Sequence, residues 1–304
     1  MITARRIRRF FDLLTFYGRR IILRQRVPLL ASFKLTHHCN INCPGCPFHL
    51  RAQEENSQMT WGQALAALET LKGKGTRIVV FEGGEPLIWR DGEHDIAELV
   101  RHAKKLFSTV AVTTNGTLPL DVPADILWVS LDGLQATHDR LRCGSFDQVW
   151  HHLETTTHPR VFVHFTMNSE NWRDLEGMLD LVKQAPRVCG VTVQLFYPYG
   201  QGEAPLALAP EDRRAALINA LALKTKYPLL NSRRSLEVMM ENKWRCHDNI
   251  LINVDPNGHI TQGCYVKDRG RISCPDCGFT PVAEASGALD LRPGSLLAGT
   301  RIFL

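Results

Sequence analysis

The sequence predicts an α/β protein, a partial (β/α)6 barrel followed by a small C-terminal domain that combines a β-hairpin with a group of cysteines. Between residues 30 and 226 of the 304-residue chain, about six apolar segments of strand length alternate with segments of helical periodicity. The strand segments are almost continuously apolar, which is typical of a parallel sheet covered on both faces. Right-handed crossovers between such strands give a barrel or a doubly wound sheet. After residue 228 the alternation stops, and polar stretches with four cysteines follow.

Residues 1–27 form a basic segment ahead of the barrel. Residues 1–26 contain eight arginines and one aspartate, about +7 in all, whereas the whole chain carries +5. Arginine interrupts the apolar pattern every few residues and no cleavage site follows, so the segment is not a secretory signal. It is expected to be an amphipathic helix that either lies on an anionic membrane or an acidic partner, or packs across the main domain with its arginines in solvent. The apolar residues of its helical stripe are Ile7, Phe10, Phe11, Leu14 and Ile21.

The barrel is expected over residues 28–230. Its first helix begins with a capping box formed by Thr60 and Gln63, and it ends at Gly73 and Gly75. A domain boundary is expected near residue 230, and residues 231–304 form the C-terminal domain. The strands, some with the turn that follows them, are expected within 30–36, 77–86, 108–117, 125–133, 160–168 and 190–200, and the helices at 59–75, 93–107, 146–156, 171–184 and 210–226.

Polar and glycine-rich residues gather where the expected strands end. In a TIM-like barrel of parallel strands these ends lie on one face, which is the face that carries active sites. The first strand runs into three cysteines, and the motif GGEP at 83–86 follows the second. The convergence of six such ends on three thiols predicts a functional site. The other strand ends carry Thr114, Asn115, Gly116, Ser130, Asp132, Asn168, Gln194 and Tyr197.

The three cysteines, Cys39, Cys43 and Cys46, have the spacing C-x3-C-x2-C. A [4Fe–4S] cluster needs one ligand for each iron, so three thiolates hold three irons and leave the fourth open to a substrate or cofactor. A structural zinc site usually takes four ligands, which this loop alone does not supply. The spacing therefore favours an iron–sulfur cluster with one open coordination position.

This spacing, on the loop after the first strand, resembles that of the radical S-adenosylmethionine (SAM) superfamily. GGEP is similar to the family motif that holds the SAM amino group. SLDGLQATHDRLRCGSF, at 130–146, is similar to a segment of members that carry SPASM or Twitch extensions. Two positions depart from the pattern. Gly45 replaces a residue that is often aromatic and packs on SAM, and Cys143 replaces a glycine.

The resemblance implies two cofactors, a [4Fe–4S] cluster and SAM, and an external electron donor of the flavodoxin or ferredoxin type. One electron from the cluster would cleave SAM to methionine and a 5′-deoxyadenosyl radical, which removes a hydrogen atom from a substrate or adds to it. The implied cluster ligands are the three cysteines named above. The implied SAM or substrate contacts, each of which can instead be an ordinary turn or surface residue, are Gly83, Gly84, Glu85, Ser130, Asp132, Arg142, Asn168 and Gln194.

A second set of cysteines lies in the C-terminal domain. The stretch ILINVDPNGHITQG is expected to form a β-hairpin around a turn at 255–258, which brings Cys246 and Cys264 together. Cys274 and Cys277 would complete a site of four thiolates. This site is similar to a Twitch extension with one auxiliary [4Fe–4S] cluster, and the alternative is a structural zinc site. The two remaining cysteines, Cys143 and Cys189, are expected to be buried structural thiols.

Three functions are consistent with the sequence. The first is a radical SAM enzyme acting on a small-molecule or lipid-like substrate. The second is a maturase of a ribosomally made peptide (a RiPP), and the third is a non-catalytic iron–sulfur redox or binding protein. The near-neutral core has no broad basic face, so no nucleic-acid partner is expected. An odd number of cysteines, nine, of which seven fall in two groups, and the lack of an apolar run near 18 residues favour the cytoplasm, with membrane contact at the surface through residues 1–26 as one option.

Overall fold

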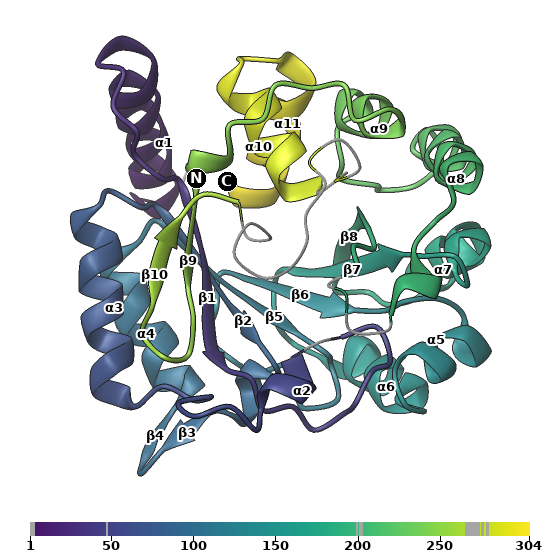
Figure 1. Cartoon of the computed structure of the whole chain (residues 1–304), viewed down its shortest axis with the longest axis horizontal. Coiled ribbons are helices and arrows are strands. Elements are labelled where there is room, and N and C mark those ends of the chain that lie inside the picture. The colour runs from purple at the N-terminus through teal and green to yellow at the C-terminus, as the bar shows by residue number, and fades with distance from the viewer. Residues whose placement is uncertain are drawn as a thin grey trace.

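The computed structural model describes residues 4–46, 48–198, 200, 203–264, 274, 277 and 280–304, and it confirms the α/β class (Figure 1). Within these residues, one mostly parallel sheet contains eight strands in the order β10-β9-β1-β2-β5-β6-β7-β8. The six strands of the expected barrel are consecutive neighbours in this order, and all pair in parallel. They span Leu30–Thr36 (β1), Ile78–Gly83 (β2), Thr109–Thr114 (β5), Ile126–Ser130 (β6), Val161–Met167 (β7) and Val188–Leu195 (β8).

The helices that connect these strands lie around the outside of the sheet (Figure 1). The predicted capping box is present, because the Gln63 amide donates to Thr60 Oγ1 (3.3 Å) and the Thr60 amide donates to Gln63 Oε1 (2.8 Å). A short hairpin, β3 (Arg90–Asp91) with β4 (His94–Asp95), directly precedes the helix that begins at Ile96. The helices span Phe48–Arg51 (α2), Trp61–Gly73 (α3), Ile96–Leu106 (α4), Gln135–Leu141 (α5), Phe146–Thr155 (α6), Leu175–Val182 (α7) and Pro210–Leu223 (α8).

The two faces of the parallel strands differ, because successive side chains point to opposite sides of a sheet. The outer face is apolar and packs against the helices, and Phe33, Phe81 and Phe165 are completely buried there. The inner face changes along the strands, from apolar near their amino ends to polar near their carboxyl ends. The amino end of the barrel is therefore closed by a hydrophobic cluster, whose members are Ile78, Val80, Ala111, Ile126, Phe162, Leu230 and Ile302.

The predicted C-terminal hairpin is present, and it extends the sheet of the barrel. β9 (Leu251–Val254) pairs in parallel with β1, and β10 (Ile260–Gln262) pairs antiparallel with β9. The division near residue 230 stays a prediction, although this strand pairing joins the two expected parts. Three helices in this part of the chain were not predicted from the sequence. They span Arg233–Met240 (α9), Thr280–Leu289 (α10) and Pro293–Phe303 (α11).

The first helix, α1 (Ala4–Tyr17), continues into a π-helical turn, η1 (Gly18–Ile22), and lies against the amino ends of the strands. Arg9 forms an ion pair with Asp125 (3.1 Å) just before β6, and its Nε donates to the Ser108 carbonyl (3.0 Å) just before β5. Asp12 pairs with Arg77 (3.4 Å), just before β2. The helix therefore packs across the end of the barrel that is opposite to the strand carboxyl ends.

Of the two alternatives for this segment, the one that packs its apolar stripe on the main domain with the arginines in solvent is wrong in its choice of face. All five stripe residues are exposed, whereas Arg9 is only 8% exposed and Phe16 only 1%. The helix packs on the main domain through its other face, which carries buried ion pairs and Phe16. Within the described part of the chain, no helix has the length and apolar character needed to span a bilayer.

Candidate functional site

The loop between β1 and α2 places three free thiols, Cys39, Cys43 and Cys46, at the carboxyl end of the barrel. The Cys46 amide donates to the Cys43 carbonyl (3.1 Å), which folds the second half of the loop into a tight turn. Asn115, just after β5, donates from its side-chain amide to Cys39 Sγ (3.6 Å) and to Asn40 Oδ1 (2.8 Å). The neighbouring strand end therefore holds the loop in place.

The electrostatic environment of these thiols suits ligands that ionise on binding a metal. Burial raises the pKa of all three thiols, and that of Cys43 reaches about 12. The positive charge of Arg142 acts in the opposite direction on Cys43 and Cys46. A bound metal offsets the cost of buried thiolates by displacing their protons. Among the described residues, no three His, Cys, Asp or Glu side chains converge closely enough to hold a single metal ion.

The two glycines of the GGEP motif are required by close backbone packing. A Cβ atom on Gly84 would lie 2.0 Å from the carbonyl oxygen of His38, and one on Gly83 would lie 2.4 Å from that of Thr36. Gly83 also has a φ of +136°, which favours glycine. The amides of Gly84 and Glu85 donate to the Thr36 and His38 carbonyls (2.8 and 2.9 Å). The motif therefore supports the start of the cysteine loop, and a direct contact of these glycines with SAM stays a prediction.

Glu85 is completely buried and uses both carboxylate oxygens within the protein. Its Oε1 accepts from Thr114 Oγ1 (2.8 Å) and from the Leu87 amide (3.0 Å), and its Oε2 accepts from the Asn115 amide (2.7 Å). Burial raises the pKa of Glu85 to about 7, and these hydrogen bonds limit the rise. This geometry assigns Glu85 a positioning role, because it joins the end of β2 to the end of β5 beside the cysteine loop.

The space beside Gly45 is filled by an aromatic residue from another part of the chain. A Cβ atom at Gly45 would lie 3.1 Å from the ring of Phe196 and 2.9 Å from Leu206 Cδ1. Phe196 follows β8 and is anchored by its amide, which donates to the Met167 carbonyl (2.8 Å). A larger residue at position 45 would therefore collide with Phe196, and the two positions together explain the departure at Gly45.

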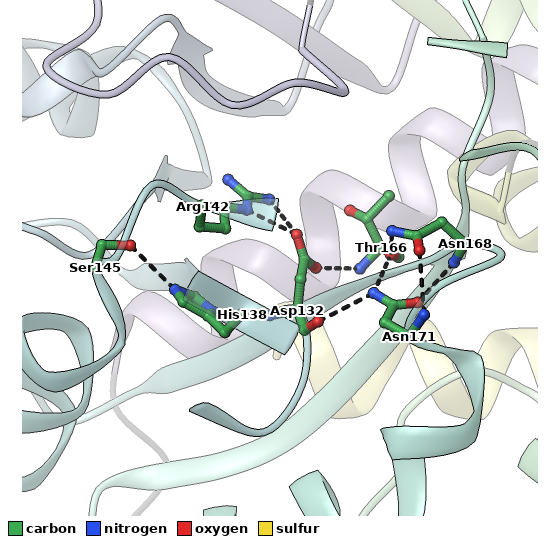
Figure 2. A network of polar contacts seen from close by, with 7 residues as sticks. All are labelled: Asp132, His138, Arg142, Ser145, Thr166, Asn168 and Asn171. Atoms are coloured by element: carbon green, nitrogen blue, oxygen red, sulfur yellow. Dashed lines mark hydrogen bonds and ion pairs between the residues drawn. The ribbon is translucent and has the colours of Figure 1, made fainter. Parts of the chain in front are cut away.

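Asp132 and Arg142 form the charged centre of a network at the ends of β6 and β7 (Figure 2). Arg142 donates from Nε and from one terminal nitrogen to the same Asp132 oxygen, both at 2.7 Å. The other Asp132 oxygen accepts from the Thr166 amide (2.7 Å). Burial alone would lower the pKa of Arg142, but the carboxylate of Asp132 and the nearby thiols raise it. Arg142 therefore stays charged and links this network to the cysteine loop.

Two further side chains brace this network. The Asp132 amide donates to Nδ1 of the buried His138 (3.1 Å), so the ring carries its proton on Nε2, which donates to Ser145 Oγ (3.1 Å). Asn171 donates to the carbonyls of Asp132 (3.1 Å) and Thr166 (2.9 Å). Figure 2 shows Asn171 lying between Asp132 and Asn168.

Asn168, a predicted SAM or substrate contact, is used in the turn after β7. Its Oδ1 accepts from the amides of Glu170 (2.9 Å) and Asn171 (3.2 Å), and it is only 4% exposed. The structure thus gives Asn168 a turn-forming role, and its contact with a ligand stays a prediction. Ser130 is buried at the end of β6, and Gln194 is half-buried near the end of β8.

The inner face of the barrel carries a polar group below these strand ends. Lys34 is completely buried, forms an ion pair with Glu82 (3.2 Å) and donates to Ser32 Oγ (2.7 Å), which in turn contacts Glu82. Across the barrel, His164 Nδ1 lies 3.1 Å from Thr192 Oγ1. Burial lowers the pKa of His164, which favours the neutral ring. The two opposite charges and the neutral imidazole give this inner face little net charge.

The C-terminal hairpin lies between Cys246 and Cys264, and the shared thiolate site expected of them stays a prediction. The charges of Cys264 and Cys277 both act on Cys246, whose pKa burial raises to about 12. Cys274 is joined to this group because its carbonyl accepts from the Cys277 amide (3.3 Å) and from the Asn242 side chain (3.1 Å). All four are free thiols. In the described residues these thiols do not converge closely enough to hold a single metal ion, so the four-thiolate site and its occupant both stay predictions.

The expectation that Cys143 and Cys189 are buried is wrong, because both are exposed. Cys143 has a φ of +58°, in the left-handed region, which explains why a glycine is usual at this position. Cys189 lies at the start of β8, near the amino ends of the strands, away from the site.

Some residues of the site were not assigned a role from the sequence. Asn115 was noted only as a strand end, and its polar neighbours Thr114 and Gly116 gave the available signal. The sequence signal for Lys34 was clearer, since a lysine inside an apolar strand must find a buried partner. The sequence held no signal for Phe196, because its contact with Gly45 is formed between residues far apart in the chain. Tyr197 is half-buried, and the neighbouring Tyr199 lies outside the described residues.

Comparison with known proteins agrees with this site. The family model described as the Radical SAM superfamily matches residues 33–182. An Fe-coproporphyrin III synthase of Methanosarcina barkeri is 28% identical over 174 residues, which is 53% of this chain and 43% of that protein. An AdoMet-dependent heme synthase of the same organism is 25% identical over 287 residues, covering 86% of this chain and 80% of that protein. The first of these matches thus spans less than half of the relative.

A solved structure shares the fold at low sequence identity. The crystal structure of SuiB from Streptococcus suis, bound to the precursor peptide SuiA, aligns with a TM-score of 0.63 and 14% identity. The alignment covers 86% of this chain and 65% of that one. This likeness shows that the two chains share their arrangement of strands and helices.

The first test concerns the packing of the GGEP motif. Gly84→Ala should lower the free energy of unfolding by about 1–3 kcal/mol and reduce iron at the first cysteine loop, because a Cβ overlaps the His38 carbonyl. Thermal unfolding and iron analysis measure both effects. Gly62→Ala is the matched control, because a Cβ there meets nothing within 4 Å. Equal behaviour of the two variants would contradict the proposed packing.

The second test concerns the buried His138. Burial lowers its pKa from 6.5 to about 4, so in this window the unfolded chain binds a proton that the folded protein rejects. The free energy of unfolding should therefore fall as the pH falls through this range. His138→Gln keeps an acceptor for Asp132 and a donor for Ser145 and should flatten that dependence in urea unfolding. The surface variant His151→Gln should leave the slope unchanged, and an unchanged slope in His138→Gln would count against the assignment.

Proposed function

This chain is a member of the radical SAM superfamily, and we propose that it reductively cleaves SAM at a [4Fe–4S] cluster held by Cys39, Cys43 and Cys46. The observation that supports this most directly is the set of three free thiols at the carboxyl end of β1. They are fixed by Asn115 and lie within reach of the charge of Arg142. When bound, the cluster supplies the electron that breaks the sulfonium of SAM and releases a 5′-deoxyadenosyl radical.

The surrounding residues have positioning roles in this proposal. Gly84 and Glu85 fix the start of the cysteine loop, and Asn115 donates to the Cys39 sulfur. Arg142 keeps a positive charge beside the thiolates, which favours their ionised form. Asp132 uses two nitrogens of Arg142, so the third nitrogen is the one that can bind the carboxylate of SAM. Phe196 takes the place of the aromatic residue that position 45 lacks.

The inner face of the barrel is the proposed substrate site. It lies beneath the strand ends that carry the thiols, and the hydrophobic cluster at the amino ends closes its floor. Lys34 is balanced by Glu82, and His164 is neutral. Such a lining favours a neutral polar substrate over one with several carboxylates, because an unbalanced buried charge is costly. We therefore favour a small molecule, including a lipid-like one with a polar head, from which the radical removes a hydrogen atom or to which it adds.

A peptide substrate is the second candidate. It is favoured by the likeness to SuiB, whose structure was solved with the precursor peptide SuiA. In that case a single side chain of the peptide would enter the barrel, and the same inner face would hold it. External reduction by a flavodoxin or ferredoxin is part of both candidates.

The four C-terminal cysteines are proposed to bind an auxiliary [4Fe–4S] cluster, with structural zinc as the alternative. With four protein ligands such a cluster has no open position, so electron transfer is its expected role. The approach of Cys246, Cys264 and Cys277 through the hairpin supports a shared site.

The third test removes the two cysteine sets separately. Protein reconstituted without air should hold about eight irons, about four for each cluster. Alanine at Cys39, Cys43 and Cys46 should leave about four irons and abolish 5′-deoxyadenosine formation. Alanine at Cys274 and Cys277 should also remove about half of the iron but keep SAM cleavage. Persistent SAM cleavage in the first variant would refute the proposal, and about one zinc with four irons in the wild type would replace the auxiliary cluster with zinc.

The fourth test addresses the substrate site. The double variant Lys34→Met, Glu82→Gln preserves charge balance, so it should fold and retain basal SAM cleavage. The measurement is the increase in 5′-deoxyadenosine caused by the low-molecular-mass fraction of a host-cell extract. This increase should be lost in the double variant and kept in the surface control Lys243→Met, whose side chain is 80% exposed. Stimulation by the peptide fraction alone would instead favour the second candidate.

A further inference from the structure

The helix α1 has a charged face that packs on the protein and an apolar face that points outward, the reverse of an ordinary surface helix. Residues at helical spacing on one side contact the body of the protein, and two of them, Arg9 and Asp12, make ion pairs there. Phe16, on the same side, is 1% exposed and packs with Val27 and Ile250. Charged groups thus face the protein, whereas the opposite side of the helix is apolar and faces outward.

We call this outward side, with the turn that follows, the α1 outer face. It contains seven large apolar residues with exposed fractions between 44% and 78%. The rings of Phe10 and Phe11 touch each other edge to face, with centroids 5.9 Å apart. They lie beside Ile7 and Leu14 at helical spacing. The full set is Ile7, Phe10, Phe11, Leu14, Ile21, Ile22 and Leu23.

Arginines border this face. The side chain of Arg8 is 52% exposed, and Arg24 and Arg26 are exposed just beyond η1. Residues 1–26 carry about +7, whereas the rest of the chain carries about −2, the difference from the total of +5. A cluster of aromatic and aliphatic side chains with a basic border is the pattern of a helix that lies in a membrane interface.

We propose that the α1 outer face docks on an anionic lipid bilayer. Such a surface offers acyl chains to the apolar residues and phosphate-bearing headgroups to the arginines. A second copy of the chain is a poor occupant, because two segments of about +7 would repel each other. Phe16, Arg9 and Asp12 fix the helix to the amino ends of the strands, so the face is held in place before the lipid binds.

The experiment uses the full chain with its iron, because deleting residues 1–26 would also remove the buried contacts of Phe16 and Arg9. Sedimentation with vesicles of phosphatidylcholine alone, or mixed with phosphatidylglycerol, measures the bound fraction at low and high salt. Size analysis in solution and SAM cleavage are recorded for every variant. The key variant is Phe10→Ser with Phe11→Ser. The matched control is Ile218→Ser with Leu297→Ser, two apolar residues elsewhere that are 50% and 52% exposed.

The wild type should bind the phosphatidylglycerol vesicles at low salt, bind less at high salt, and bind phosphatidylcholine weakly. Phe10→Ser with Phe11→Ser should reduce the bound-to-free ratio at least about tenfold while SAM cleavage is retained. Arg24→Gln with Arg26→Gln should weaken binding and its salt dependence, and the control should match the wild type. Three results would overturn the proposal: no binding to anionic vesicles at low salt, equal binding by the phenylalanine variant, or a wild-type dimer that this variant dissociates.

Discussion

The close approach of Gly84 to the carbonyl of His38 is the constraint on which the site depends. The chain after β2 can come this near to the His38 carbonyl only because Gly84 has no Cβ. The hydrogen bonds of Glu85 then join the same point to the end of β5. Three consecutive strands of the barrel are thereby locked at their carboxyl ends. The cysteine loop begins at this junction, so its geometry follows from backbone packing and a buried carboxylate more than from contacts between the thiols.

The buried charges of the site occur as pairs of opposite sign. Arg142 is charged beside the thiols because Asp132 accepts two of its donors, and Asp132 in turn is held by the Thr166 amide. The ion pair of Lys34 and Glu82 is balanced in the same way inside the barrel. Such pairs cost desolvation energy, which is acceptable where they fix the orientation of groups that meet a ligand. The polar part of the inner face of the barrel is therefore concentrated toward the carboxyl ends of the strands.

Much of this arrangement could be predicted from the sequence. Continuous apolar strands, the capping box of Thr60 and Gln63, and the hairpin around residues 255–258 are local signals, and each is present in the structure. Contacts that form only across the fold left no such signal. Phe196 beside Gly45 is one case, and the close packing of α10 on α11, where a Cβ on Gly287 would lie 2.4 Å from Ser295 Oγ, is another. The alternative that the apolar stripe of α1 packs on the main domain was wrong. Periodicity shows that a helix has two different faces, but it does not show which face the protein covers.

The location of α1 determines which end of the barrel would face a membrane and which would face the solution. The helix crosses the amino ends of the strands, and the cysteine loop stands at their carboxyl ends, so the two lie at opposite poles of the barrel. A molecule tethered through α1 would turn its opening toward the aqueous phase. An electron carrier could then reach it by free diffusion in solution, and a substrate buried in the bilayer would first have to leave it. Tethering of this kind would concentrate the proposed catalyst along a surface and would keep its proposed radical intermediate away from oxidisable acyl chains.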